Sequence, residues 1–173
     1  MIPELSQTLW AQILGGAGFL VLVVAPLTRT RHRFLLLDIL GMVPVGVHYV
    51  MLKATGGAAL CAIYILMDLI AFHLHSSVAM RRIYYGFYPV AAIFTAVAWT
   101  GPADLLALAG TLFAVASRQQ PGLTLLKFLV FLSAVGWGAY GILAGSVSQT
   151  LFSLFYGGAA LFAVFRGPDT SGR

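Results

Sequence analysis

Three ionisable side chains, Asp38, His48 and Asp68, lie inside long apolar stretches of this sequence. In lipid such a side chain is costly, and it usually faces a helix-bundle interior or a water-filled cavity. The charge of a histidine can change near neutral pH, which suits a proton-linked or solute-binding role for His48. A neutral histidine hydrogen-bonded across two helices is the alternative interpretation. These residue types therefore indicate a site for a small solute or a proton.

Both acids also have a structural interpretation. Asp38 lies one turn from the end of its apolar stretch, where it could pair with Arg31 or Arg33 at the membrane interface. Asp68 lies deeper, and its alternative partner is the hydroxyl of Tyr64, one turn earlier on the same helix face. Because burial of a charge costs more at that depth, Asp68 is the strongest single candidate for a functional residue.

The second half of the chain offers aromatic and mildly polar side chains instead of acids. Trp137 and Tyr140 lie within one apolar stretch, where they form either core aromatics or a wall on which a solute stacks. The remaining polar candidates are Ser133, Gln149, Thr150 and Ser153. His73 and His75 follow Asp68, but positions 73 and 75 face different sides of a helix, so we expect no metal site.

The composition determines which elements can hold these residues. Of 173 residues, 60% are hydrophobic and 9% are charged, against about 25% charged residues in soluble domains. An ordinary soluble enzyme, a nucleic-acid-binding domain and a disordered chain are therefore excluded. The single cysteine, Cys61, excludes an intramolecular disulfide. The composition predicts an integral membrane protein, in which a net charge of +5 reflects basic cytoplasmic loops.

Seven apolar segments are candidate membrane-spanning helices. They are Leu9–Leu27, Phe34–Leu52, Gly57–Leu74, Ile83–Trp99, Ala103–Ala116, Thr124–Leu143 and Val147–Phe165. The fifth is short and weakly apolar, and whether it fully spans is left open. The connections are short, so neighbouring spans are expected to form antiparallel hairpins. The chain begins with an acid, Glu4, and no base, so we expect the first segment to be a retained span.

The loops predict an orientation, because basic residues gather on the cytoplasmic side of a membrane. If all seven segments cross, nine of the ten Lys and Arg residues fall on one side and only Lys53 falls on the other. The nine are Arg29, Arg31, Arg33, Arg81, Arg82, Arg118, Lys127, Arg166 and Arg173. This asymmetry supports an odd number of crossings. It places the N-terminus outside and the C-terminus inside.

The order of the segments indicates an internal repeat. Segments one to three consist of a span, a basic loop, a second span, a short loop of small residues and a third span, and segments five to seven have the same order. A shift of 91 positions places Tyr49 on Tyr140. Repetition in the same orientation needs a linking span, which segment four supplies. We therefore predict a single membrane domain over 1–173, with a first triple-helix bundle over 9–76, a linker helix over 83–99 and a second bundle over 103–166.

Short motifs distributed along the chain resemble a known family. They are Leu27-Thr28-Arg29-Thr30-Arg31-His32-Arg33-Phe34, Gly46-Val47-His48-Tyr49, Leu105 to Gly110, Leu143-Ala144-Gly145-Ser146 and Phe165-Arg166. Over roughly residues 10–167 the chain resembles the YgjV family of bacterial inner membrane proteins. The resemblance implies an inner-membrane location. It also groups the chain with the SWEET, SemiSWEET, PQ-loop and nicotinamide-riboside transporters.

That grouping implies an all-α, SWEET-like fold of seven transmembrane helices in a 3+1+3 arrangement of parallel triple-helix bundles. The sequence departs from the SWEET pattern in two respects. Pro26 and Pro44 fit the first bundle, but the fifth and sixth segments have no internal proline. The chain also contains no asparagine, so the asparagine with which SWEET proteins bind sugar has no counterpart.

Two functions of different classes remain open. In the first, the chain is a small-solute transporter, facilitated or ion-coupled, whose bundles rock about a cavity lined by Asp68, His48, Trp137 and Tyr140. In the second, it is a non-transporting scaffold or regulatory protein, with Asp68 and His48 in fully satisfied pairs and no cavity. Common enzyme and phosphate-binding motifs are missing, so we expect neither catalysis nor a cofactor. The expected partners are the lipid bilayer and a small solute, and a homo-oligomer is left open.

Overall fold

A computed structural model describes residues 2–51, 55–73, 78–97, 99, 101–144 and 147–166. Every regular element in these ranges is a helix, so the all-α class expected from the sequence is confirmed. The elements are α1 (Ile2–Val24), a 3-10 turn η1 (Ala25–Leu27), α2 (Arg31–Met51), α3 (Thr55–His73), α4 (Val78–Val97), α5 (Asp104–Arg118), α6 (Leu123–Leu143) and α7 (Val147–Phe165).

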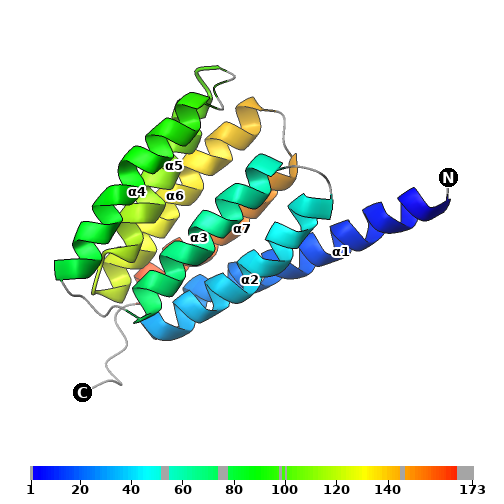
Figure 1. The fold of residues 1–173 in the computed structure, drawn as a ribbon. Helices are drawn as coiled ribbons and strands as arrows, with labels where there is room; N and C mark the ends of the chain where they lie inside the picture. Colours follow the sequence, from blue (N-terminus) through cyan, green and yellow to red (C-terminus); the bar gives the residue numbers. More distant parts are fainter. Residues whose placement is uncertain are drawn as a thin grey trace.

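The helices form one bundle in which neighbours in the chain run antiparallel (Figure 1). Helix α2 packs between α1 and α3, and α6 packs between α5 and α7. We call α1–α3 the first helix group and α5–α7 the second helix group. The two groups meet where α1 packs against α7 and where α3 approaches α5. Helix α4 lies at the edge of the bundle, against α5 and α3.

The observed helix ends differ from the apolar segments for physical reasons. Helix α4 begins at Val78 instead of Ile83, because Arg81 and Arg82 interrupt the apolar pattern without interrupting the helix. Helix α5 continues to Arg118, beyond the last apolar residue. Pro26 lies in the 3-10 turn that ends the first segment, where its missing N–H donor removes a hydrogen bond by which α1 would continue.

The outer surface of the bundle is apolar. The residues Leu20, Val97 and Phe165 expose 72%, 84% and 80% of their surface, which is unfavourable in water and favourable against lipid tails. Within the described part of the chain, three helical stretches are long and apolar enough to cross a membrane. They are Leu9–Leu27, Arg31–Met51 and Leu123–Leu143. Shorter apolar stretches cover Ala58–His73 and Gln149–Phe165.

Glycine permits the closest helix crossings, one in each helix group. A Cβ atom on Gly18 of α1 would lie 2.7 Å from the carbonyl oxygen of Gly41 on α2. A Cβ atom on Gly136 of α6 would lie 2.8 Å from the Cα atom of Gly110 on α5. Small residues allow two helix backbones to approach and pack in lipid, so both crossings depend on the absence of a side chain.

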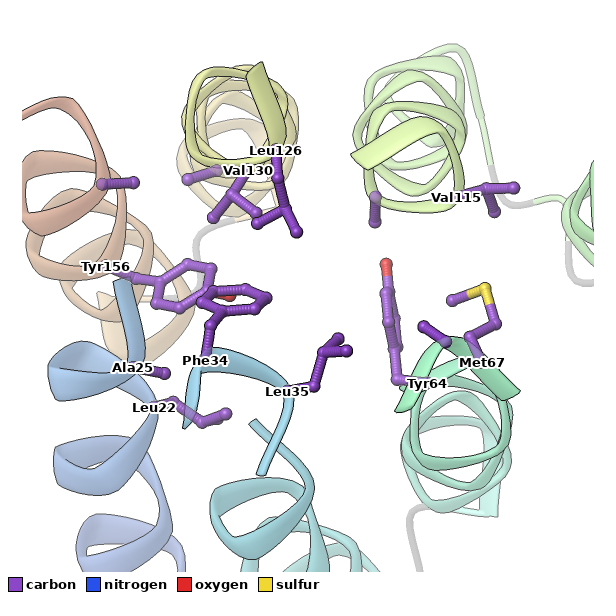
Figure 2. Packing of buried hydrophobic residues seen from close by; sticks show 14 of the residues in the cluster. Leu22, Ala25, Phe34, Leu35, Tyr64, Met67, Val115, Leu126, Val130 and Tyr156 are labelled. Atoms are coloured by element: carbon purple, nitrogen blue, oxygen red, sulfur yellow. The ribbon is translucent and has the colours of Figure 1, made fainter. Parts of the chain in front are cut away.

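Large apolar side chains from both helix groups pack around the interior between them. Figure 2 shows Phe34 and Leu35 of α2, Tyr64 of α3, Val130 of α6 and Tyr156 of α7 converging on one region. Tyr64, whose hydroxyl is directed away from α3, reaches toward α5 in the same view. Polar atoms that enter this interior must therefore find partners from the protein itself.

Candidate functional site

Arg118, the last residue of α5, lies in the interior with only 2% of its surface exposed. Its Nε atom donates to Oδ1 of Asp68 on α3 at 2.7 Å, and its Nη2 atom donates to Oδ2 of Asp38 on α2. Both carboxylates are fully buried. We call Asp38, Asp68 and Arg118 the charge cluster. It joins the second helix group to two helices of the first.

Further hydrogen bonds complete the charge cluster. The Tyr156 hydroxyl of α7 donates to Oδ1 of Asp38 at 3.0 Å, and Arg118 Nη1 donates to Ser117 Oγ at 3.1 Å. The guanidinium also lies against the rings of Phe34 and Tyr64, with its carbon 5.8 and 5.7 Å from their centroids. Buried charges persist only when they are paired and hydrogen-bonded. This cluster meets that condition through residues of four helices.

The pairing corrects the sequence-based interpretations of both acids. Asp38 pairs with Arg118, 80 positions away, and not with Arg31 or Arg33 beside it. Asp68 also bonds Arg118 and not the hydroxyl of Tyr64. Arg118 itself was expected in a loop on the charged side of the membrane. It is instead buried, because both carboxylates require a counter-charge that the first helix group does not place next to them.

Two more basic side chains bind backbone carbonyls across the same end of the bundle. Arg31 donates from Nη1 to the Ala71 carbonyl and from Nη2 to the Arg118 carbonyl, both at 2.8 Å. Lys127 of α6 donates from Nζ to the Thr28 carbonyl at 2.6 Å. We call this end, which carries Arg31, Arg118 and Lys127, the basic end. Two of these bonds, Arg31 to Arg118 and Lys127 to Thr28, join the two helix groups at the basic end.

A cavity of about 120 Å³ lies between the two helix groups. It extends from Arg118 toward the end opposite the basic end, where Tyr49, Leu60 and Gln149 line it. The remaining lining residues are Phe19, Leu22, Met42, Val45, Cys61, Tyr64, Ala114, Val130, Ser133, Ala134, Trp137, Phe152, Ser153 and Tyr156. Because all three helices of each group contribute, the cavity changes shape whenever the groups move relative to each other.

Two predicted aromatic residues meet at the cavity wall. Trp137 of α6 donates from Nε1 to the hydroxyl of Tyr64 on α3 at 3.2 Å, and both side chains line the cavity. Tyr140 packs edge-on against the Trp137 ring, with centroids 5.8 Å apart, and does not belong to the lining. Of the six predicted site residues, the charge cluster and the cavity wall together hold four, namely Asp38, Asp68, Tyr64 and Trp137.

His48 lies away from this region, inside the first helix group. Its Nδ1 atom is 2.8 Å from the Ala11 carbonyl of α1. A Cβ atom on Gly15 would lie 2.8 Å from the His48 ring, so the missing side chain makes room for it. The structure therefore places His48 where it fastens α2 to α1, which is the structural interpretation of this residue.

Sequence reasoning missed Arg118 and Tyr156 as members of the site. The available signal is the presence of two acids inside long apolar segments, which favours a cation from elsewhere in the chain as their partner. Among the described residues, no group of three or more His, Cys, Asp or Glu side chains is placed to hold a metal ion. His75, Lys53 and Arg173 lie outside the described residues.

The comparisons with known proteins identify a family. The sequence model of Imp-YgjV, described as "Bacterial inner membrane protein", matches residues 9–170, which is nearly the whole chain. No curated protein and no solved structure matches the chain.

Proposed function

Because the chain belongs to the Imp-YgjV family of bacterial inner membrane proteins, we propose that it is a small-solute transporter that works by alternating access. The cavity between the two helix groups, with ion-paired Arg118 at its wall, is the observation that carries this proposal. A solute held between two groups of helices can be exposed to either side when the groups rock. The movement is either facilitated diffusion or coupled to an ion.

The arrangement of the helices supports a 3+1+3 plan with α4 as the linker. In each helix group the second helix packs between the first and the third. Each group also has a glycine crossing between its first two helices, at Gly18–Gly41 and at Gly110–Gly136. Two units of the same design in one chain would complete a transport pathway without a second copy.

The charge cluster is a suitable gate for the basic end. Its bonds join the helix groups on one side of the cavity only, so the described conformation is closed at the basic end. Opening that end requires Arg118 to leave both carboxylates. Since basic loops face the cytoplasm, we place the basic end there, with the N-terminus outside and the C-terminus inside.

Cys61, the single cysteine, provides a native reporter because it lines the cavity. A membrane-impermeant thiol reagent, sulfonatoethyl methanethiosulfonate, is applied to right-side-out and to inverted membrane vesicles. In the wild-type protein we expect faster labelling from the side opposite the basic end. In the Asp68→Asn and Arg118→Gln variants, the rate of Cys61 labelling from the basic end should rise. The rise should be about tenfold for each 1.4 kcal/mol by which the substitution destabilises the conformation closed at the basic end.

Two controls make the labelling interpretable. Asp104→Asn makes the same chemical change at a buried acid outside the charge cluster, where Oδ2 accepts from the Gly101 N–H at 3.0 Å. We expect it to leave the sidedness unchanged, and Cys61→Ser should abolish labelling. Alternating access is contradicted if labelling keeps the same sidedness in the wild type and in both cluster variants.

The second candidate is a non-transporting scaffold or regulatory protein. It is favoured by one observation, that both buried carboxylates have complete ion-pair partners in the described conformation. A scaffold would keep these pairs permanently, so its Cys61 would be labelled from one side or from neither, whatever happens to the cluster. The cavity between the groups favours the transporter, because permanent packing would be better served by a filled interior.

A further inference from the structure

The size of the cavity limits the solute. An apolar cavity of about 150 Å³ in a protein interior accepts benzene, so a cavity of about 120 Å³ accepts a body of about six non-hydrogen atoms in the described conformation. Aromatic faces form part of its wall. Phe19 of α1 and Phe152 of α7 lie 4.5 Å apart between ring centroids, and Phe152 stacks on Tyr156 at 5.3 Å. Such a wall binds a compact apolar body by contact.

The charges around the cavity favour neither an anion nor a cation. Among the described lining residues Arg118 alone is charged, and its guanidinium already donates to Asp38, Asp68 and Ser117. An anionic solute would have to compete with two carboxylates for that guanidinium. A cationic solute would meet the guanidinium itself. Arg31, which lies at the basic end, adds a second positive charge. The two arginines then balance the two carboxylates of the charge cluster.

The polar atoms of the cavity lie mainly on the second helix group. Gln149 donates from Nε2 to the Ser153 Oγ at 3.0 Å, and Ser133 adds a hydroxyl from α6. The facing wall from α1 and α2 is mainly apolar, with Phe19, Leu22, Met42 and Val45. Tyr49 of α2 adds one hydroxyl at the end of the cavity opposite the basic end. Hydroxyl and amide groups form hydrogen bonds with uncharged donors and acceptors. The cavity is therefore two-sided, with one mainly apolar wall on α1 and α2 and one hydrogen-bonding patch on α6 and α7.

We propose that the solute bound in this cavity is uncharged and has about six non-hydrogen atoms in total, comprising a small apolar body and one hydrogen-bonding group such as a carboxamide or hydroxyl. This inference rests on the proposed function, because it describes the solute of the same cavity. The apolar body packs against α1 and α2, and the polar group bonds the patch of Ser133, Gln149 and Ser153.

Three molecules of nearly equal shape test the charge preference, namely isobutyramide, isobutyrate and isobutyramidine, which are neutral, anionic and cationic at pH 7. The purified wild-type protein is treated with N-ethylmaleimide, and the rate of alkylation of Cys61 is measured with each molecule present. We expect isobutyramide to slow alkylation by about tenfold at ten times its Kd. Isobutyrate and isobutyramidine should have little effect at the same concentration.

A melting-temperature series provides a second readout that does not depend on thiol chemistry. Isobutyramide should raise the melting temperature of the wild-type protein, and Ser153→Ala should reduce both this rise and the protection of Cys61. Thr95→Val, which removes a hydroxyl on α4 that bonds the Ala91 carbonyl, is the matched control and should preserve both. The inference is overturned if a charged molecule protects better than isobutyramide, or if isobutyramide gives neither protection nor a melting shift.

The outcome is separable from that of the proposed function. Sidedness of Cys61 labelling is measured without any solute, so alternating access can hold while the charged molecules bind better. In that case the transporter stands and the solute class is wrong. Binding of isobutyramide with a fixed sidedness of labelling would instead support the cavity as a binding site in a protein that does not transport.

Discussion

Replacing Arg118 with glutamine removes the guanidinium that bonds two fully buried carboxylates. Removing one partner of a buried ion pair costs about 3–5 kcal/mol, because the other charge is left without compensation. Here two carboxylates lose their partner, so we expect Arg118→Gln to lower the free energy of unfolding by at least about 3 kcal/mol. The measurement is unfolding of the purified protein in mixed micelles with increasing dodecyl sulfate, followed by tryptophan fluorescence.

Two companion variants isolate the cause of that loss. Arg166→Gln also removes an arginine at a helix end, but Arg166 is exposed and rests on the Phe162 ring, so its loss should cost about 1 kcal/mol or less. Combining Arg118→Gln with Asp38→Asn and Asp68→Asn removes the uncompensated charges and should recover most of the stability. The burial argument fails if Arg118→Gln costs no more than Arg166→Gln, or if the triple variant is no more stable than Arg118→Gln alone.

Two further changes test the helix packing. Gly136→Ala would place a Cβ atom 2.8 Å from Gly110 and should destabilise the protein by about 1–3 kcal/mol in the same unfolding assay, whereas Gly158→Ala meets nothing within 4 Å and should be neutral or slightly stabilising. His48→Phe removes the bond to the Ala11 carbonyl and should cost about 1–3 kcal/mol. His48→Phe should leave the sidedness of Cys61 labelling unchanged. A changed sidedness would show that His48 belongs to the functional site.

Local sequence patterns were sufficient for the helices and for the two acids. Hydropathy located all seven helices that the structure describes, and most of their ends to within three residues, since each presents an apolar surface to its surroundings. The exceptions are the starts of α1, at Ile2 instead of Leu9, and of α4, at Val78 instead of Ile83. The cost of burying a charge singled out Asp38 and Asp68 before any contact was known. The family resemblance stated from the motifs is confirmed by the match over residues 9–170.

The partners of those acids could not be predicted in the same way. Arg118 pairs with Asp38 and Asp68 across 80 and 50 positions, and such pairing depends on how the helix groups meet. Counting charges by loop placed Arg118 among the exposed basic residues, because the count ignores the last turn of a helix. His48 was grouped with the site because its depth in the apolar segment resembles that of a functional residue. The position of a residue within its apolar segment does not determine which neighbouring helix its side chain contacts.

The long separation between the charge-cluster partners has a consequence for biogenesis. A chain is synthesised from its N-terminus, so Asp38 and Asp68 emerge from the ribosome 80 and 50 residues before Arg118. Until α5 has been synthesised, the two acids in the apolar helices α2 and α3 lack Arg118 as their ion-pair partner. Arg118 gives both carboxylates a shared ion-pair partner and connects the second helix group, which is synthesised later, to the first. The ion pairs of the charge cluster can therefore form only after α5 has been synthesised, and the bond from Tyr156 to Asp38 only after α7.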